Sequence, residues 1–166
     1  MVGEPPSPTS DGISFDITTF DQIDVDSVRS MLAHHFAALN LAADCEVSIS
    51  LVDEATMTDL HVRWMNEPGP TDVLSFPMDE LTIPAPGDAA ASGILGDIVV
   101  CPTFAAAQAA GKGVSIDEEV RFLITHGLLH LVGHNHDEQD EETRMFALQD
   151  QLLESWSRSL TQGGVR

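Results

Sequence analysis

Alternating and helix-spaced apolar positions follow one another along this chain and predict a mixed order of strands and helices. Apolar and polar residues alternate over 12–19 and 46–52, the pattern of half-buried strands. Two further runs of strand length lie at 72–77 and 94–100. Apolar side chains recur at helical spacing elsewhere and predict helices over about 24–40, 54–65, 102–113, 115–131 and 137–159.

Turn-forming and capping residues separate these segments. A Pro-Gly-Pro run at 68–70 ends the second predicted helix, and Ser115 followed by Glu118 is a capping-box signature for the fourth. The stretch 78–93 is rich in Pro, Gly, Ala and Asp and predicts a long mobile loop. Strands interspersed with helices indicate an α/β or α+β fold.

The chain has the length of one domain, with 166 residues and no internal repeat. We expect a single domain over 12–160. Residues 1–11 carry three prolines without an apolar period and predict a disordered lead-in, and 161–166 predict a flexible C-terminus.

Two features of composition bear on location. No run approaches the roughly 18 apolar residues of a membrane helix, and the first residues lack the basic and apolar regions of a signal peptide. We therefore expect a cytoplasmic protein without a membrane partner. Cys45 and Cys101 are far apart and each lies in an apolar stretch, which predicts buried free thiols.

The charge is strongly acidic. Seven Lys and Arg residues face 27 Asp and Glu residues, which gives a net charge of −20. A field of that sign repels nucleic acid at long range and, taken alone, argues against an RNA or DNA partner.

A histidine cluster carries the strongest chemical signal. His126 and His130 are four residues apart, so on a helix their imidazoles project from one face, about 40° apart. Such a pair can chelate a metal ion. Gly133 permits a positive φ that ends the helix and lets His136 supply a third nitrogen. His134 is the alternative third ligand, although its reach from the turn is less favourable.

Three protein ligands leave one position of a tetrahedral zinc ion for water, as in catalytic sites. Metzincin proteases share this histidine spacing, but they place a glutamate general base directly after the first histidine. Gly127 occupies that position here. The sequence therefore argues against proteolysis by that mechanism.

Three blocks of the sequence carry a more specific signal. They read HGLLHLVGHNH at 126–136, PTDVLSFP at 70–77 and LGDIVV at 95–100. In order and spacing they resemble the YbeY family of bacterial metallo-endoribonucleases, over about residues 13–156.

The resemblance implies a single-domain α/β fold with a small, mixed, four-stranded sheet flanked by helices. It implies one Zn²⁺ per chain, bound by His126, His130 and His136 on a helix of the C-terminal half and the turn that follows. It also implies cleavage of single-stranded RNA in 16S rRNA 3′-end maturation and in late-stage ribosome quality control. The implied partners are ribosomal RNA precursor and the ribosome or small-subunit assembly proteins, with no DNA.

Two candidate catalytic residues follow from this resemblance and from the site. The family often has an arginine five residues before its PTDVLSFP block. A gapless match puts Met65 there, and Arg63, two residues earlier, is the nearest candidate. Asp137, next to His136, is either a helix cap or a base.

Other polar residues are candidates for supporting roles. Asp72 and Asp97 could orient a ligand histidine from outside the metal's own ligands, and Ser75 could face the cleft. The acidic total requires cations to gather near the metal if RNA is the substrate. Arg63 and Arg121 are the nearest in sequence, and Arg121 points about 140° away from His126 on one helix.

Two other functions remain open at this point. One is a metal-dependent hydrolase that acts on a different substrate. The other is a non-catalytic ribosome-assembly factor whose zinc is structural.

Overall fold

The structure, a computed structural model, describes residues 12–17, 23–67, 69, 71–134 and 138–164. Its strands are β1 (Gly12–Ile17), β2 (Glu46–Leu51), β3 (Val73–Pro77) and β4 (Ile94–Val100). Its helices are α1 (Val25–Ala38), α2 (Glu54–Met65), α3 (Pro102–Lys112), α4 (Ile116–Leu131) and α5 (Gln139–Gly164). Each element lies where the apolar pattern predicts one.

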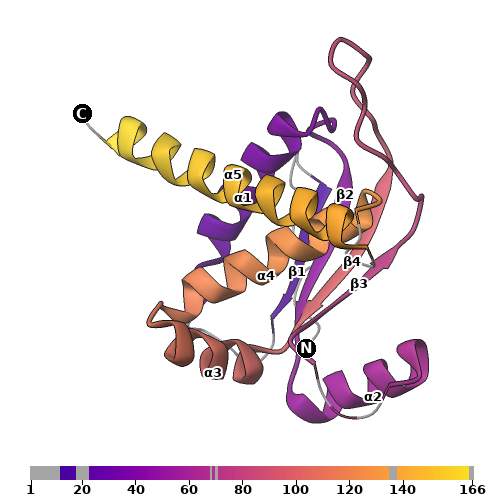
Figure 1. Ribbon diagram of the computed structural model, residues 1–166, viewed down its shortest axis with the longest axis vertical. Coiled ribbons are helices and arrows are strands. Elements are labelled where there is room, and N and C mark those ends of the chain that lie inside the picture. The colour runs from indigo at the N-terminus through magenta and orange to yellow at the C-terminus, as the bar shows by residue number, and fades with distance from the viewer. Residues whose placement is uncertain (1–11, 18–22, 68, 70, 135–137, 165–166) are drawn as a thin grey trace, which may run out of the picture.

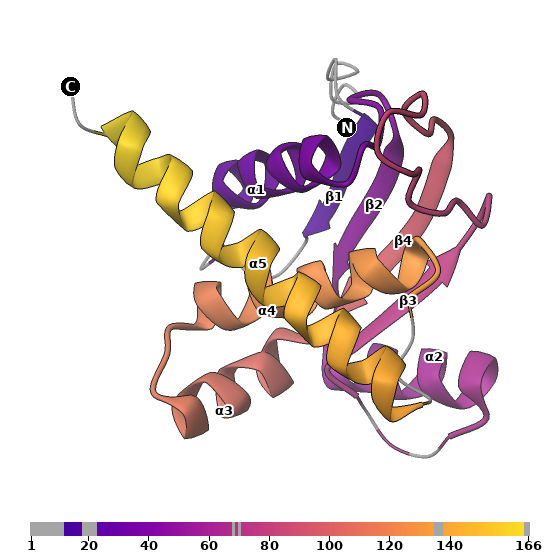
Figure 2. The ribbon, with the colours of Figure 1, turned by 45° about the horizontal axis from the view of Figure 1, so that its top comes forward.

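The four strands form one mixed sheet in the order β1-β2-β4-β3. The pairs β1–β2 and β2–β4 are parallel, and β3 runs antiparallel to β4 at the edge. Helices α1, α4 and α5 lie together over one face of this sheet (Figures 1 and 2). The prediction of a single α/β domain with a mixed four-stranded sheet is confirmed.

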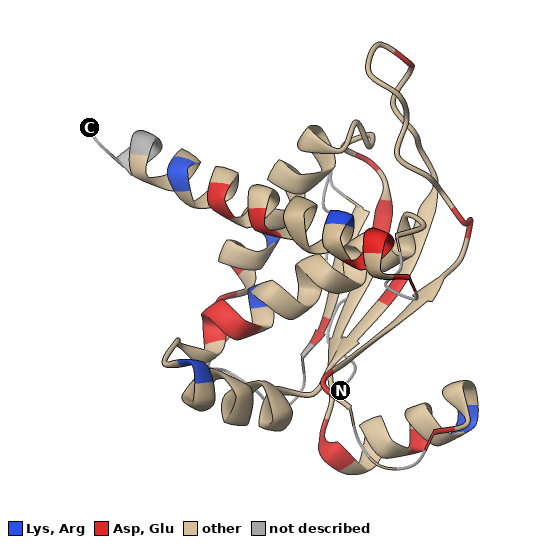
Figure 3. Ribbon diagram, viewed as in Figure 1, with Lys and Arg blue, Asp and Glu red and all other residues tan. Residues whose placement is uncertain are grey.

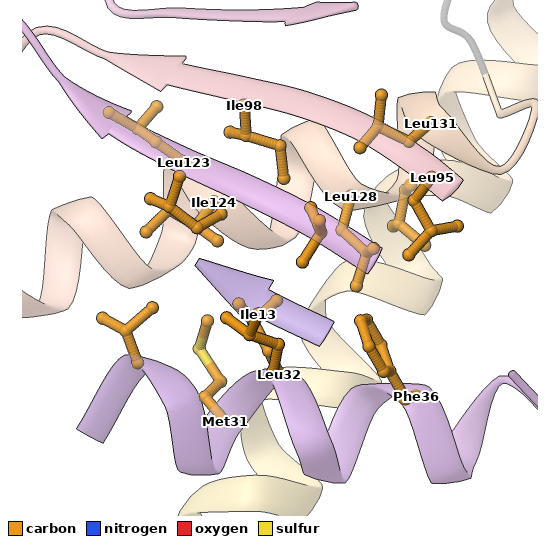
Figure 4. Close-up of a cluster of buried hydrophobic side chains, with 14 of the residues drawn as sticks. Ile13, Met31, Leu32, Phe36, Leu95, Ile98, Leu123, Ile124, Leu128 and Leu131 are labelled. Carbon is orange, nitrogen blue, oxygen red and sulfur yellow. The ribbon is translucent and has the colours of Figure 1, made fainter. Parts of the chain in front are cut away.

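The main core lies between the sheet and these three helices. Figure 4 shows Met31, Leu32 and Phe36 of α1 directed at side chains of the sheet and of α4. From the sheet, Ile98 of β4 has no exposed surface, and neither has Leu128 of α4. Burial of apolar area at about 25 cal/mol per Å² is the principal force that holds α4 on the sheet.

A smaller apolar cluster lies on the opposite face of the sheet. Met57 of α2 packs there with Leu74, Val99 and Cys101. Because side chains alternate across a strand, Val99 and Ile98 of β4 enter different clusters. Cys101 and Cys45 are both buried free thiols, as predicted.

Capping residues begin the helices as the sequence indicates. The Ser115 side chain accepts a hydrogen bond from the Glu118 backbone N–H (3.1 Å), and Asp24 caps α1 by accepting from Ser27 N–H. Helix α5 continues to Gly164, beyond the residue 159 at which we expected it to end. The lead-in 1–11 lies outside the described residues.

The long connection 78–93 has irregular backbone, as predicted, but parts of it are anchored. Leu81, Ile83 and Ala91 pack against the main core, and Ala91 bridges to Leu41. Within the described ranges, no helix is long and apolar enough to cross a membrane.

Candidate metal centre

Helix α4 brings two imidazoles together at its C-terminal end. The Nε2 atoms of His126 and His130 lie 3.2 Å apart. Two nitrogen ligands bound at about 2.0–2.1 Å to a tetrahedral ion are separated by about 3.3 Å. The spacing of the two nitrogens therefore fits a shared metal ion, and the all-imidazole donor set suits zinc.

The end of α4 has the geometry that the histidine motif requires. Gly133 has φ +96°, in the left-handed region. The Gly133 N–H donates to the His130 carbonyl (3.1 Å), and the His134 N–H donates to the Leu129 carbonyl (3.0 Å). These two bonds form a Schellman motif, which reverses the chain direction. The prediction that Gly133 ends the helix with a positive φ is confirmed.

The third ligand falls outside the described part of the chain. His136 and Asp137 both lie in the range 135–137, which the structure does not describe. Within the described ranges, no three His, Cys, Asp or Glu side chains gather into a metal site. His134 lines the pocket beside the His126–His130 pair, and burial lowers the pKa of its imidazole. The choice of His136 as third ligand stays a prediction.

Gln149 of α5 contacts His126, one member of this pair, at its second ring nitrogen. Its Oε1 lies 3.1 Å from His126 Nδ1, and its Nε2 donates to the Phe122 carbonyl oxygen (3.3 Å). The side chain has no exposed surface. We did not find Gln149 from the sequence, although one signal was present. It is a polar residue within the apolar stripe of α5, four positions after the buried Met145.

The histidine pair opens into a pocket of about 840 Å³. The edge strand β3 forms one wall, because α4 packs against it. The end of α2 and the first turns of α5 complete the rim. The described lining residues are Met65, Thr71, Asp72, Val73, Leu74, Ser75, Pro77, Phe122, Leu123, His126, Gly127, His130, Gly133, His134, Glu142 and Phe146.

Of the polar candidates, Ser75 and Asp72 line this pocket and Asp97 does not. Ser75 and Leu74 are consecutive residues of β3. Ser75 lines the pocket, and Leu74 belongs to the smaller apolar cluster with Met57 of α2. The Asp72 carboxylate accepts hydrogen bonds from the Val73 backbone N–H (2.7 Å) and from Gln108 Nε2 (3.1 Å). These bonds hold Asp72 at the start of β3.

Asp97 lies on a different part of the sheet. It lines a second pocket of about 380 Å³ with residues of β1, β2 and β4. The side chain of the next residue, Ile98, packs in the main core on the face of the sheet that α4 covers. The alternation of β4 thus directs Asp97 away from the face that carries the histidine pair.

Neither candidate arginine lines the histidine pocket. Arg63 is exposed on α2 and forms an ion pair with Asp59 (3.3 Å). The Arg121 guanidinium lies over the Trp156 ring, 5.3 Å from its centroid, beside another pocket. Figure 3 shows that both signs of charge are scattered over the helices. No Lys or Arg occurs in the described lining, so the expectation of an electropositive cleft built by these arginines is not met.

Apolar side chains occupy the rim instead. Met65, at the position where the family resemblance led us to expect an arginine, lines the pocket from the end of α2. Phe146 lines it from α5, with its ring centroid 5.8 Å from that of His126. Gly127 lies where a metzincin has its glutamate. A Cβ there would come within 2.9 Å of Ile98, so a side chain at 127 meets β4.

Comparisons with known proteins identify the family of this chain. The family model described as endoribonuclease YbeY matches residues 13–157. A Thermobifida fusca protein named endoribonuclease YbeY is 52% identical over 150 residues, covering 89% of this chain and 97% of that protein. A Mycolicibacterium paratuberculosis protein of the same name is 49% identical over 152 residues, covering 87% and 84%.

A solved structure shares the fold. The solution structure of TM1509 from Thermotoga maritima superposes with a TM-score of 0.62 at 23% identity, over 91% of this chain and 93% of that one. At that identity the likeness concerns the fold alone. The family resemblance seen in the three sequence blocks is confirmed by the sequence matches: the chain belongs to the endoribonuclease YbeY family.

Proposed function

We propose that this protein is a zinc-dependent endoribonuclease that cleaves single-stranded RNA. The observation that carries the proposal is the pair of imidazole nitrogens, 3.2 Å apart, at the wall of an open pocket of about 840 Å³. Family membership supports RNA as the substrate, since the relatives are named endoribonucleases.

We assign a separate role in this site to each of the residues below. His126 and His130 hold the metal from α4, with His136 as the proposed third ligand. Zinc held there would supply Lewis-acid polarisation of a phosphoryl oxygen and would lower the pKa of water toward about 7. Ser75 offers a hydroxyl to substrate from β3, and Asp72 fixes the start of that strand.

Proton transfer requires a side chain close to the ligands. Gly127 has no side chain to act as a base, so we propose Asp137, next to His136, for this role. Arg63 stays a weaker proposal, because its guanidinium is paired with Asp59 and does not line the pocket.

Single-stranded RNA suits the walls of this pocket better than a duplex. The rim presents the Phe146 ring and the Met65 side chain, which offer stacking and apolar contact to an unpaired base. The described lining offers no Lys or Arg for a phosphate backbone. A base that is already unpaired can enter the pocket without the cost of opening a duplex.

The proposed biological setting follows the family. We infer action in 16S rRNA 3′-end maturation and in late-stage ribosome quality control, in the cytoplasm. Two buried free thiols are consistent with a reducing compartment. Because the chain carries a net charge of −20, we propose that the ribosome or small-subunit assembly proteins deliver the RNA.

The test is cleavage of a single-stranded RNA oligonucleotide by zinc-loaded protein, compared with a His130→Ala variant. We expect the variant to lose cleavage at least 100-fold, and EDTA to abolish cleavage by the wild type. Cleavage that survives EDTA would contradict the metal mechanism. Cleavage of a peptide but not of RNA would favour another hydrolase, and tight zinc binding with neither activity would favour an assembly factor.

A further inference from the structure

Gln149 is a buried amide in an otherwise apolar stripe of α5. The side chain has no exposed surface, and its stripe neighbours Met145 and Leu152 are also buried. Burial of an amide is unfavourable unless its polar atoms are hydrogen-bonded. Both of its partners, His126 and Phe122, belong to α4. The amide therefore connects α5 to the metal-site helix at one defined point.

The two hydrogen bonds together determine where the proton of His126 lies. A backbone carbonyl can only accept, so the Gln149 amide nitrogen faces the Phe122 oxygen (3.3 Å). The amide oxygen then faces His126 Nδ1 (3.1 Å), and since this oxygen also can only accept, Nδ1 carries the hydrogen.

A neutral imidazole has a single N–H, so the other ring nitrogen keeps its lone pair. In His126 that nitrogen is Nε2, the atom 3.2 Å from His130 Nε2. The hydrogen bond to Gln149 thus selects the tautomer whose Nε2 lone pair points to the proposed metal position. It also holds the ring plane, because rotation of the imidazole would break the bond to a fully buried partner.

We propose that Gln149 is a positioning residue that presents His126 Nε2 to the metal in the correct tautomer and orientation. The inference rests on the proposed metal site. A partner on the second ring nitrogen commonly contributes 10–100-fold to metal affinity, roughly, because the ligand is preorganised before the metal arrives.

The experiment measures zinc affinity by competition with a chromophoric chelator. Gln149→Leu keeps the volume and removes the acceptor, and we expect zinc to bind about 10–100-fold more weakly. Gln149→Glu keeps an acceptor for His126 Nδ1 but loses the N–H that Gln149 donates to Phe122, so it should retain more zinc affinity than Gln149→Leu. Leu152→Ala is the control: it loosens α5 without touching His126 and should stay within about threefold of wild type.

A second readout separates positioning from simple packing. Nitrogen-15 NMR of the zinc-free protein at about pH 8, where histidines are neutral, reports which ring nitrogen is protonated. We expect the Nδ1–H form of His126 in the wild type and a mixture of tautomers in Gln149→Leu.

The two readouts distinguish failure of the inference from failure of the proposed function. Equal zinc affinity in wild type and Gln149→Leu, or an unchanged His126 tautomer, would overturn the role of Gln149. A wild-type chain with no affinity for zinc would instead contradict the proposed function, and the tautomer of His126 would still decide the inference.

Discussion

His35 and His126 show at the residue scale how burial separates two histidines of the same chain. His126 lines the pocket, and its Nε2 lies 3.2 Å from the Nε2 of His130. His35 has no exposed surface, and its Nε2 lies 3.1 Å from Thr125 Oγ1. Its Nδ1 has no hydrogen-bond partner in the described part of the chain. His35 is therefore a core residue.

The buried His35 predicts a loss of stability in mild acid. Burial, with a smaller contribution from His34, lowers its pKa from 6.5 to about 3. Between these values the unfolded chain binds a proton that the folded chain does not. The free energy of unfolding is therefore unaffected by the protonation of His35 above pH 6.5. It decreases as the pH falls from 6.5 toward 3, with a slope of about 1.4 kcal/mol per pH unit.

Urea unfolding of wild type and His35→Leu between about pH 6.5 and 4.5 checks this slope. The acidic side chains contribute equally to both proteins, so the difference between the two slopes isolates His35. We expect the wild type to lose about 1.4 kcal/mol more per pH unit than the variant. Parallel curves would show that His35 keeps an ordinary pKa in the fold.

At the element scale, α4 organises the site because it contacts the sheet and its neighbouring helices. Ser115 caps its start, and the Gly133 turn ends it beside the histidine pair. Lys112 of α3 is joined to the buried Glu119 of α4 by a salt bridge of 2.7 Å. The position of α4 over the sheet in turn determines where the His126 ring lies relative to β3.

The close approach of α4 to β4 depends on Gly127. A Cβ added there would lie 2.9 Å from Ile98 Cγ2, a contact that real Cβ atoms essentially never make. We expect Gly127→Ala to lower the free energy of unfolding by about 1–3 kcal/mol, because the helix must move off the strand. Zinc affinity should fall as well, since His126 moves with the helix.

A matched control is available in α3. A Cβ at Gly111 would meet nothing within 4 Å, so Gly111→Ala should raise stability by about 0.5–1 kcal/mol through helix propensity. Thermal or urea unfolding of both variants makes the comparison. In addition, Ile98→Ala should lower the free energy of unfolding by less in the Gly127→Ala background than in the wild type. Additive effects of the two substitutions would contradict the contact.

At the scale of the whole molecule, the charge distribution conflicts with a polyanionic substrate. The net charge is −20, and the described pocket lining contains Asp72 and Glu142 but no Lys or Arg. Arg121 and Lys112 line a different pocket, together with Glu118, Glu119 and Glu154. Under the proposed function, affinity for RNA must therefore come mainly from a bound metal, from contacts to bases and from the proposed delivering partner.

This distribution predicts weak RNA binding with a shallow dependence on salt concentration. In a His130→Ala variant, which lacks one proposed metal ligand, we expect single-stranded RNA to release fewer than about three counterions. The slope of log K against log salt would then be shallower than about −2. Fluorescence anisotropy at several salt concentrations measures it. A steeper slope would reveal a basic surface that the described lining lacks.

Local pattern was enough to determine the elements and the centre of the site. Alternation and helical spacing predicted the strands and helices, and the four-residue spacing predicted the imidazole pair of His126 and His130. The Gly133 turn was predictable too, because its chemistry lies within the same few residues. These features depend on neighbours within one or two turns of chain, where spacing alone sets the geometry.

Only the tertiary structure decided what surrounds that centre. It put Ser75 in the pocket and Asp97 on the other face, brought Met65 to the rim, and left Arg63 and Arg121 out of the described lining. It also joined Gln149 to His126 across 23 positions. Which face of one element meets another depends on how apolar surfaces pack between distant segments, and spacing within a single segment holds no information about that packing.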